Sequence, residues 1–195
     1  MNLSANLPQD ARALTCSEFL QHQNVSKLMQ KLSQATDALL LQLWNESGLH
    51  HDAALLAVGG YGRGELFPYS DIDILILLDD ESNSNNQHIP SNIEKFIARC
   101  WDSGLEIGSA VRSLSECLSE AAGDITIRTS VLEARPIGGN RGLFKHFKRN
   151  LEEAMEPKAF FQAKLLELQQ RHYKYQETPY ALEPNCKESP GGLRD

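Results

Sequence analysis

Two aspartates, Asp71 and Asp73, stand one residue apart at the head of an apolar run that extends to Leu78. Residues two apart on a β-strand project from the same face, so the two carboxylates would lie side by side although like charges repel. Paired carboxylates are good ligands for Mg²⁺, and two such ions can clamp the attacking and the leaving oxygen of a phosphoryl displacement. The spacing therefore predicts a metal site here, and a solvated strand end is the alternative interpretation.

A glycine-rich turn, GGYGRG from Gly59, precedes these aspartates. Gly59 and Gly60 follow a short apolar segment, and because they lack a Cβ atom a ligand can approach their backbone closely. If a helical turn follows, its free N–H groups favour a phosphate, and Arg63 could add a charge-assisted hydrogen bond. The segment lacks the GK[ST] of a P-loop and leads through Pro68 into another strand, unlike a Rossmann turn. A plain tight turn is the alternative interpretation.

Hydrophobic periodicity predicts the elements that must position these residues. Apolar residues of period 3.6 predict a helix over residues 24–47, and apolar runs predict strands over residues 53–58, 72–78 and 105–112. Further helices are expected over residues 91–102, 114–122, 124–133, 140–155 and 158–175. Trp44 and Trp101 are expected in the core. The pattern favours a small mixed sheet followed by a helical region.

Composition and charge limit the classes of partner. The chain has 195 residues, 41% of them hydrophobic and 23% charged, and a formal net charge of −7. These values are typical of a soluble globular chain, and the acidic balance argues against non-specific nucleic-acid binding. The sequence shows no signal-peptide h-region and no apolar run as long as a membrane span. Four widely spaced cysteines without a CxxC pair indicate reduced thiols, so we expect a cytoplasmic protein without nucleic-acid or membrane partners.

The glycine turn and the aspartates together resemble a known family. The order apolar–Gly–Gly, ten residues, then Asp–apolar–Asp–apolar resembles the signature of DNA polymerase beta-type nucleotidyltransferases. The fuller string VGGYGRGELFPYSDIDILILL resembles, more narrowly, the bacterial PII uridylyltransferase/uridylyl-removing enzymes, the GlnD family. The strings WDSGLEIGSAVRSLSECL, DITIRTSVLEARPIGGNRGLF and YALEPNCKESPGGLRD are similar to later segments of that family. The resemblance covers residues 55–195 and implies an α+β fold: the small mixed sheet of the polymerase beta-type nucleotidyltransferase fold, flanking helices and a C-terminal helical region.

The same resemblance implies an activity and a site. The activity is Mg²⁺-dependent transfer of UMP from UTP to a tyrosine of PII, a small nitrogen-signalling protein. The implied site residues are the catalytic metal ligands Asp71 and Asp73 and the triphosphate-binding residues Gly59 and Gly60. Arg63 and Ser70 are further candidates for nucleotide binding. A third catalytic carboxylate is expected from the neighbouring strand, where Glu106 is the candidate, although Ser109 stands where the family commonly has histidine. A rim carboxylate that solvates a strand end is the alternative for Glu106, and Tyr61 would either stack on the uracil or pack.

The expected organisation has four parts. They are an N-terminal helical segment at residues 1–50, a nucleotidyltransferase core at 51–122, a helical region at 123–175 and an irregular, truncated tail at 176–195. Family members continue into an HD-type phosphohydrolase domain and glutamine-sensing ACT domains, and neither pattern is visible here. Two alternatives stay open: a related nucleotidyltransferase with another target, and a non-catalytic nucleotide-sensing module, which an absent third carboxylate would favour.

Overall fold

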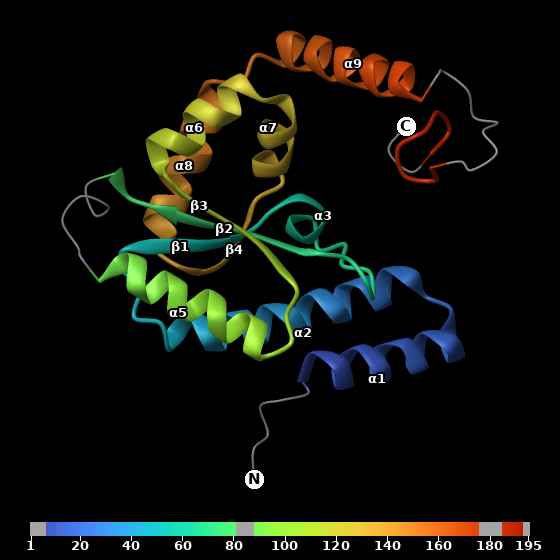
Figure 1. Ribbon diagram of the computed structural model, residues 1–195, viewed down its shortest axis with the longest axis vertical. Coiled ribbons are helices and arrows are strands. Elements are labelled where there is room, and N and C mark those ends of the chain that lie inside the picture. Colours follow the sequence, from blue (N-terminus) through green and yellow to red (C-terminus); the bar gives the residue numbers. More distant parts are fainter. Residues whose placement is uncertain (1–6, 81–87, 176–184, 193–195) are drawn as a thin grey trace. The chain divides into compact units, whose positions relative to one another are not determined.

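A four-stranded mixed sheet forms the centre of the fold, in a computed structural model that describes residues 7–80, 88–175 and 185–192 (Figure 1). Contacts divide the chain into two compact units, residues 1–151 and 152–195. The strands of the first unit are β1 (Ala53–Ala57), β2 (Ile72–Leu78), β3 (Ile107–Ser113) and β4 (Arg135–Gly139). Its helices are α1 (Leu7–His22), α2 (Val25–Asn45), α3 (Gly59–Gly62), α5 (Ile89–Asp102), α6 (Leu114–Gly123), α7 (Ile125–Leu132) and α8 (Arg141–Glu153).

The strand order is β3-β2-β1-β4, in which β1 runs antiparallel to both of its neighbours and β2 runs parallel to β3. The central strand β2 is buried on both faces beyond Asp73, as its isoleucine- and leucine-rich sequence predicts. Ile74 and Ile76 pack in one core with α2 and α5, and Leu75 and Leu77 pack in a second core with α6, α7 and α8. Figure 1 shows these two groups of helices on opposite faces of the sheet. The predicted α+β fold, a small mixed sheet with flanking helices, is confirmed.

Helix α2, which carries Asp37, has a side-chain cap at its start and a glycine shortly after its end. The side chain of Asn24 caps α2 by accepting a hydrogen bond from the Lys27 N–H, and Gly48 follows the helix with a φ of +75°. The predicted helices and strands of the first unit appear within about two residues of their expected bounds.

One strand was not predicted. β4 has the sequence RPIGG, and proline and glycine are depleted in strands, so its pattern gives no strand signal. It pairs at the edge of the sheet with β1, where its register shifts beside Leu55 and Leu56. A Cβ atom at Gly139, whose φ is +84°, would lie 2.2 Å from the Ala53 carbonyl oxygen. The close approach of two backbones explains why this edge strand needs glycine there.

The core prediction is right for one tryptophan and wrong for the other. Trp44 is fully buried, edge to face with Phe96, but Trp101 is 60% exposed. The buried residues of α5 include Ile93, Phe96 and Cys100, which share one face of the helix. Trp101 follows Cys100 directly, so the helical period turns it away from this face.

The second unit contains α9 (Pro157–Lys174) and turns within residues 185–192. None of the α9 residues is buried, and Phe161 and Tyr173 are exposed. The predicted tail falls partly outside the described residues. Among the described helices, none has both the length and the apolar character that a bilayer crossing requires.

Candidate active site

Three segments far apart in the sequence meet where β2 begins. Because β1 is antiparallel to β2, the end of β1 lies beside the start of β2, and the Val58 N–H donates to the Asp73 carbonyl at 3.1 Å. Because β3 is parallel to β2, its start lies there too: Asp73 pairs with Gly108, and the Ile72 N–H donates to the Glu106 carbonyl at 3.2 Å. The turn after β1 and the connection before β3 therefore flank the aspartates on opposite sides.

Three carboxylates line one hollow at this edge. Asp71, Asp73 and Glu106 share a cavity of about 660 Å³ with Trp101 and Gly108, and all three carboxylates are exposed. We call it the carboxylate hollow. The pairing places Gly108 on the Asp73 side of the sheet, and Glu106, two residues earlier, falls on the same side. The structure thus brings together the three residues that the sequence predicts to be catalytic.

The donor set suits a hard cation, since carboxylate oxygens are the ligands that Mg²⁺ prefers. Across the described ranges, no three His, Cys, Asp or Glu side chains are already gathered closely enough to form a metal site. Asp71, Asp73 and Glu106 nevertheless line one open hollow at the starts of β2 and β3. These residues fit a divalent cation.

Two glycines lie beside the Asp73 carboxylate, and one of them, Gly108, makes room for it. A Cβ atom at Gly108 would lie 2.7 Å from Asp73 Oδ1, and one at Gly59 would lie 3.7 Å from Asp73 Oδ2. Ordinary van der Waals contacts begin at 3.4 Å, so a side chain at residue 108 would displace the carboxylate. Gly108 was not predicted from the sequence, because its role depends on the register between β3 and β2, which leaves no local pattern.

The glycine turn forms the short helix α3, as its sequence allows. Gly59 has a φ of +59°, a backbone conformation that residues with a side chain rarely adopt, whereas Gly60 does not have a positive φ. Space also limits Gly62, since a Cβ atom there would lie 2.3 Å from the Glu133 carbonyl oxygen. Gly59 and Gly62 are thus required by the fold, but the atoms nearest to a Cβ at Gly60 would be 3.7 Å away.

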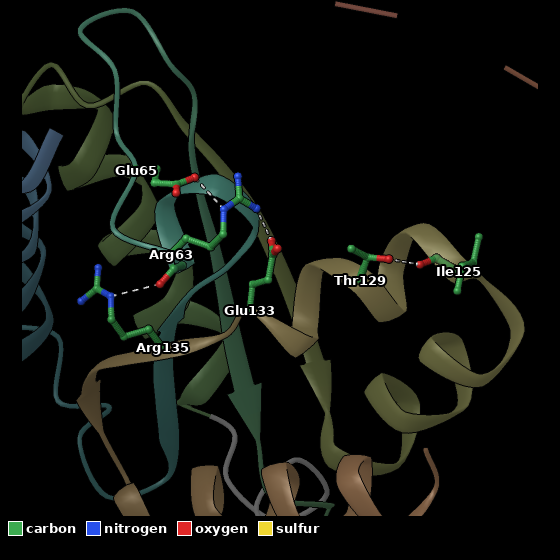
Figure 2. A network of polar contacts seen from close by, with 7 residues as sticks. Arg63, Glu65, Ile125, Thr129, Glu133 and Arg135 are labelled. Atoms are coloured by element: carbon green, nitrogen blue, oxygen red, sulfur yellow. Dashed lines mark hydrogen bonds and ion pairs between the residues drawn. The ribbon is translucent and has the colours of Figure 1, made fainter. Parts of the chain in front are cut away.

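Arg63 points to two carboxylates (Figure 2). Its Nε donates to Glu65 at 2.7 Å and its Nη1 donates to Glu133 at 2.6 Å. The hydrogen bond to Glu133, followed by the one to Glu65, raises the pKa of the Arg63 guanidinium, which is fully charged in any case. The predicted contact between Arg63 and a phosphate stays a prediction.

Ser70 lies outside the carboxylate hollow. It is exposed, and its N–H donates to the Phe67 carbonyl at 3.1 Å. Ser70 instead lines a second hollow of about 370 Å³, which lies between α2 and the 66–70 loop. We call it the α2 hollow. The two hollows share Gly104, Leu105 and Glu106, so Ser70 is close to the site without facing Asp73.

A half-buried ionic cluster holds α3 in place. Arg135 on β4 donates to both carboxylate oxygens of Asp37, at 2.7 and 3.0 Å. Its Nε also donates to the Gly62 carbonyl at 3.3 Å, and this bond is the dashed line from Arg135 in Figure 2. The Tyr61 hydroxyl donates to Asp37 at 2.5 Å, and the Arg135 guanidinium lies 5.5 Å from the centre of the Tyr61 ring. Burial, followed by the hydrogen bond to Asp37, raises the pKa of Tyr61. Only 2% of Tyr61 is exposed, so it packs, and the alternative of stacking on a uracil is wrong.

Comparison with known proteins shows the family to which the chain belongs. The description "GlnD PII-uridylyltransferase" matches residues 159–195, and "Nucleotidyltransferase domain" matches residues 40–129, which include the whole carboxylate hollow. Proteins named bifunctional uridylyltransferase/uridylyl-removing enzyme are 55% identical in Cupriavidus pinatubonensis, over 97% of this chain, and 52% identical in Ralstonia nicotianae, over 94%. The chain belongs to the GlnD family. The match spans 21% of the length of each of these two relatives.

A third relative, from Burkholderia thailandensis, has the same name and is 54% identical over 95% of this GlnD-family chain, which again spans 21% of that protein. A solved structure described as a toxin-antitoxin with AMP-PNP aligns with a TM-score of 0.38 at 13% identity, covering 72% of this chain and 98% of its own. The family assignment depends on the sequence relatives alone.

Proposed function

We propose that this part of the GlnD-family protein transfers UMP from UTP to a tyrosine of the PII protein and requires Mg²⁺. The carrying observation is the carboxylate hollow, in which Asp71, Asp73 and Glu106 line one cavity beside the glycine turn. The names and the 55% identity of the relatives favour the uridylyl group and the PII target.

In the proposed reaction the tyrosine hydroxyl oxygen attacks the α-phosphorus of UTP, an O–P bond forms, and pyrophosphate leaves as its bond to the α-phosphorus breaks. Gly59 and Gly60 accommodate the triphosphate, because their backbone is not covered by side chains of their own. Asp71, Asp73 and Glu106 would hold Mg²⁺, which when bound neutralises charge on the phosphate oxygens. Gly108 keeps the Asp73 carboxylate in the hollow, and Arg135 keeps α3 beside it.

Two nucleotide-binding assignments remain part of the proposal. Arg63 binds a phosphate, because its exposed guanidinium carries five N–H donors and lies beside the glycine turn. Ser70 contributes to nucleotide binding from the loop directly before Asp71. The presence of Glu106 on the hollow counts against a non-catalytic nucleotide-sensing module, for which an absent third carboxylate was the expected sign.

The proposal is tested by transfer of label from α-³²P-UTP to purified PII in the presence of Mg²⁺. The unchanged chain should label PII on tyrosine, and Asp71→Asn and Asp73→Asn should each reduce the rate by about a hundredfold or more. Glu94→Gln is the control, because Glu94 is an exposed carboxylate on α5 that does not line the hollow. Wild-type rates in both aspartate variants, or no transfer by the unchanged chain, would contradict the proposal.

A further inference from the structure

The carboxylate hollow has a large aromatic side chain on its rim. Trp101 lies in the last turn of α5 and lines the hollow together with Asp71 and Asp73, yet 60% of it is exposed. The other tryptophan, Trp44, is fully buried. Tryptophan is among the residue types that contribute most to binding at protein interfaces, so the exposed Trp101 beside three carboxylates indicates a binding surface.

The topology places Trp101 on one particular side of these carboxylates. β2 lies between β1 and β3, so the glycine turn that follows β1 and the α5–β3 connection that precedes β3 lie on opposite sides of Asp73. Figure 1 shows α3 and this connection at the same edge of the sheet. Trp101 and Gly104 thus face the hollow from the side opposite to Gly59.

The next step rests on the proposed function. In an in-line displacement, one of these two sides belongs to the nucleophile and the other to the leaving group. The nucleophile and the leaving group occupy opposite sides of the reacting phosphorus. With the triphosphate on the Gly59 side, the pyrophosphate leaves there and the tyrosine hydroxyl enters from the β3 side. We propose that Trp101 and the adjoining residues Gly104 and Glu106 form the contact surface for the tyrosine-bearing segment of the acceptor protein.

Charge and neighbouring side chains define the partner further. Within the described part of the chain, the charged residues that line the two hollows are Asp71, Asp73 and Glu106, and no Lys, Arg or His lines either hollow. The segment next to the acceptor tyrosine must therefore be neutral or basic to avoid repulsion. The α2 hollow, which shares Gly104 and Glu106, continues the surface with Tyr69, 90% exposed. The surface thus pairs aromatic side chains with negative charge.

The fluorescence of Trp101 tests this directly in the unchanged 195-residue chain. Because Trp44 is fully buried, acrylamide quenching at low concentration reports mainly on Trp101, and Trp101→Phe gives the background. The ligands are Mg²⁺ with α,β-methylene-UTP, which cannot react, and a tryptophan-free PII protein. We expect the nucleotide alone to leave quenching unchanged and the addition of PII to reduce it several-fold. Protection by the nucleotide alone would overturn the proposal and assign Trp101 to the base.

A kinetic measurement supplies the second arm. Trp101→Ala should raise KM for PII by about 30-fold, as for an interface hot spot, while KM for UTP stays unchanged. Leu20→Ala is the control, because Leu20 is 77% exposed on α1 and lines neither hollow. An unchanged KM for PII, or unprotected Trp101 while calorimetry shows PII bound, would overturn the proposal. Failure of the proposed function is distinguishable, since the unchanged chain would then not transfer UMP to PII at all.

Discussion

A methyl group at Gly108 should damage the site without damaging the fold. In Gly108→Ala the new Cβ atom would lie 2.7 Å from Asp73 Oδ1, whereas ordinary contacts begin at 3.4 Å, so the oxygen must withdraw by about 0.7 Å. The obstacle is the end of an exposed side chain, which can rotate away into the hollow. We therefore expect the free energy of unfolding to change by about 1 kcal/mol or less.

The same displacement matters far more for chemistry, because a misplacement of about 1 Å can cost about a hundredfold in rate. We expect Gly108→Ala to lower kcat for UMP transfer by about 10- to 100-fold and to weaken Mg²⁺-dependent UTP binding. Thermal unfolding and UTP titration separate the two effects. Gly123→Ala is the matched control, because Gly123 does not have a positive φ and a Cβ atom there would meet nothing within 4 Å. Wild-type binding and transfer in Gly108→Ala would refute the reasoning, as would an unfolded variant.

Gly60→Val should change the unfolding free energy by about 1–2 kcal/mol at most, because neither backbone strain nor a close atom opposes the new side chain, but it should abolish UTP binding. A destabilised variant that still binds UTP would mean that the glycine turn has only a structural role. Arg135→Ala removes hydrogen bonds to a half-buried carboxylate and to α3, and should cost about 2 kcal/mol in chemical denaturation; no loss would mean that the cluster does not hold α3. Asp124 caps α7, and backbone hydrogen bonds lower its pKa below 3.8, so its contribution is present above pH 3.8 and lost as the pH falls through the lowered value. Asp124→Ala should therefore lower Tm at pH 7 and match the unchanged chain in acid, and a gap independent of pH would contradict the cap. Burial raises the pKa of Cys100 to about 12 and that of Cys117 to about 11, so maleimide at pH 7 should label neither until denaturant is added, as mass spectrometry would show.

The sequence was informative where a local pattern decides the structure. The apolar run after Asp73 predicts β2 with its observed bounds, and the two-residue spacing predicts the aspartates on one side, where both line the carboxylate hollow. The sequence left open whether a helical turn follows the first strand, and α3 shows that one does. These features depend on residues that are close in sequence.

Other features depend on contacts between distant segments. The pairing of Asp73 with Gly108 follows from strand register, and the ion pair of Arg135 with Asp37 joins residues from β4 and α2. Neither leaves a local signature. Trp101 was misplaced because hydrophobicity alone assigns tryptophan to the core, whereas the helical period of α5 turns it outward.

The most direct test of the central claim is a calorimetric titration of UTP into the chain with and without Mg²⁺. The claim is that Asp71 and Asp73 hold the cation that binds the triphosphate. We expect Mg²⁺ to tighten UTP binding by about tenfold or more in the unchanged chain, which corresponds to about 1.4 kcal/mol, and to have no such effect in Asp73→Asn. An equal gain from Mg²⁺ in Asp73→Asn, with the variant folded, would contradict the account.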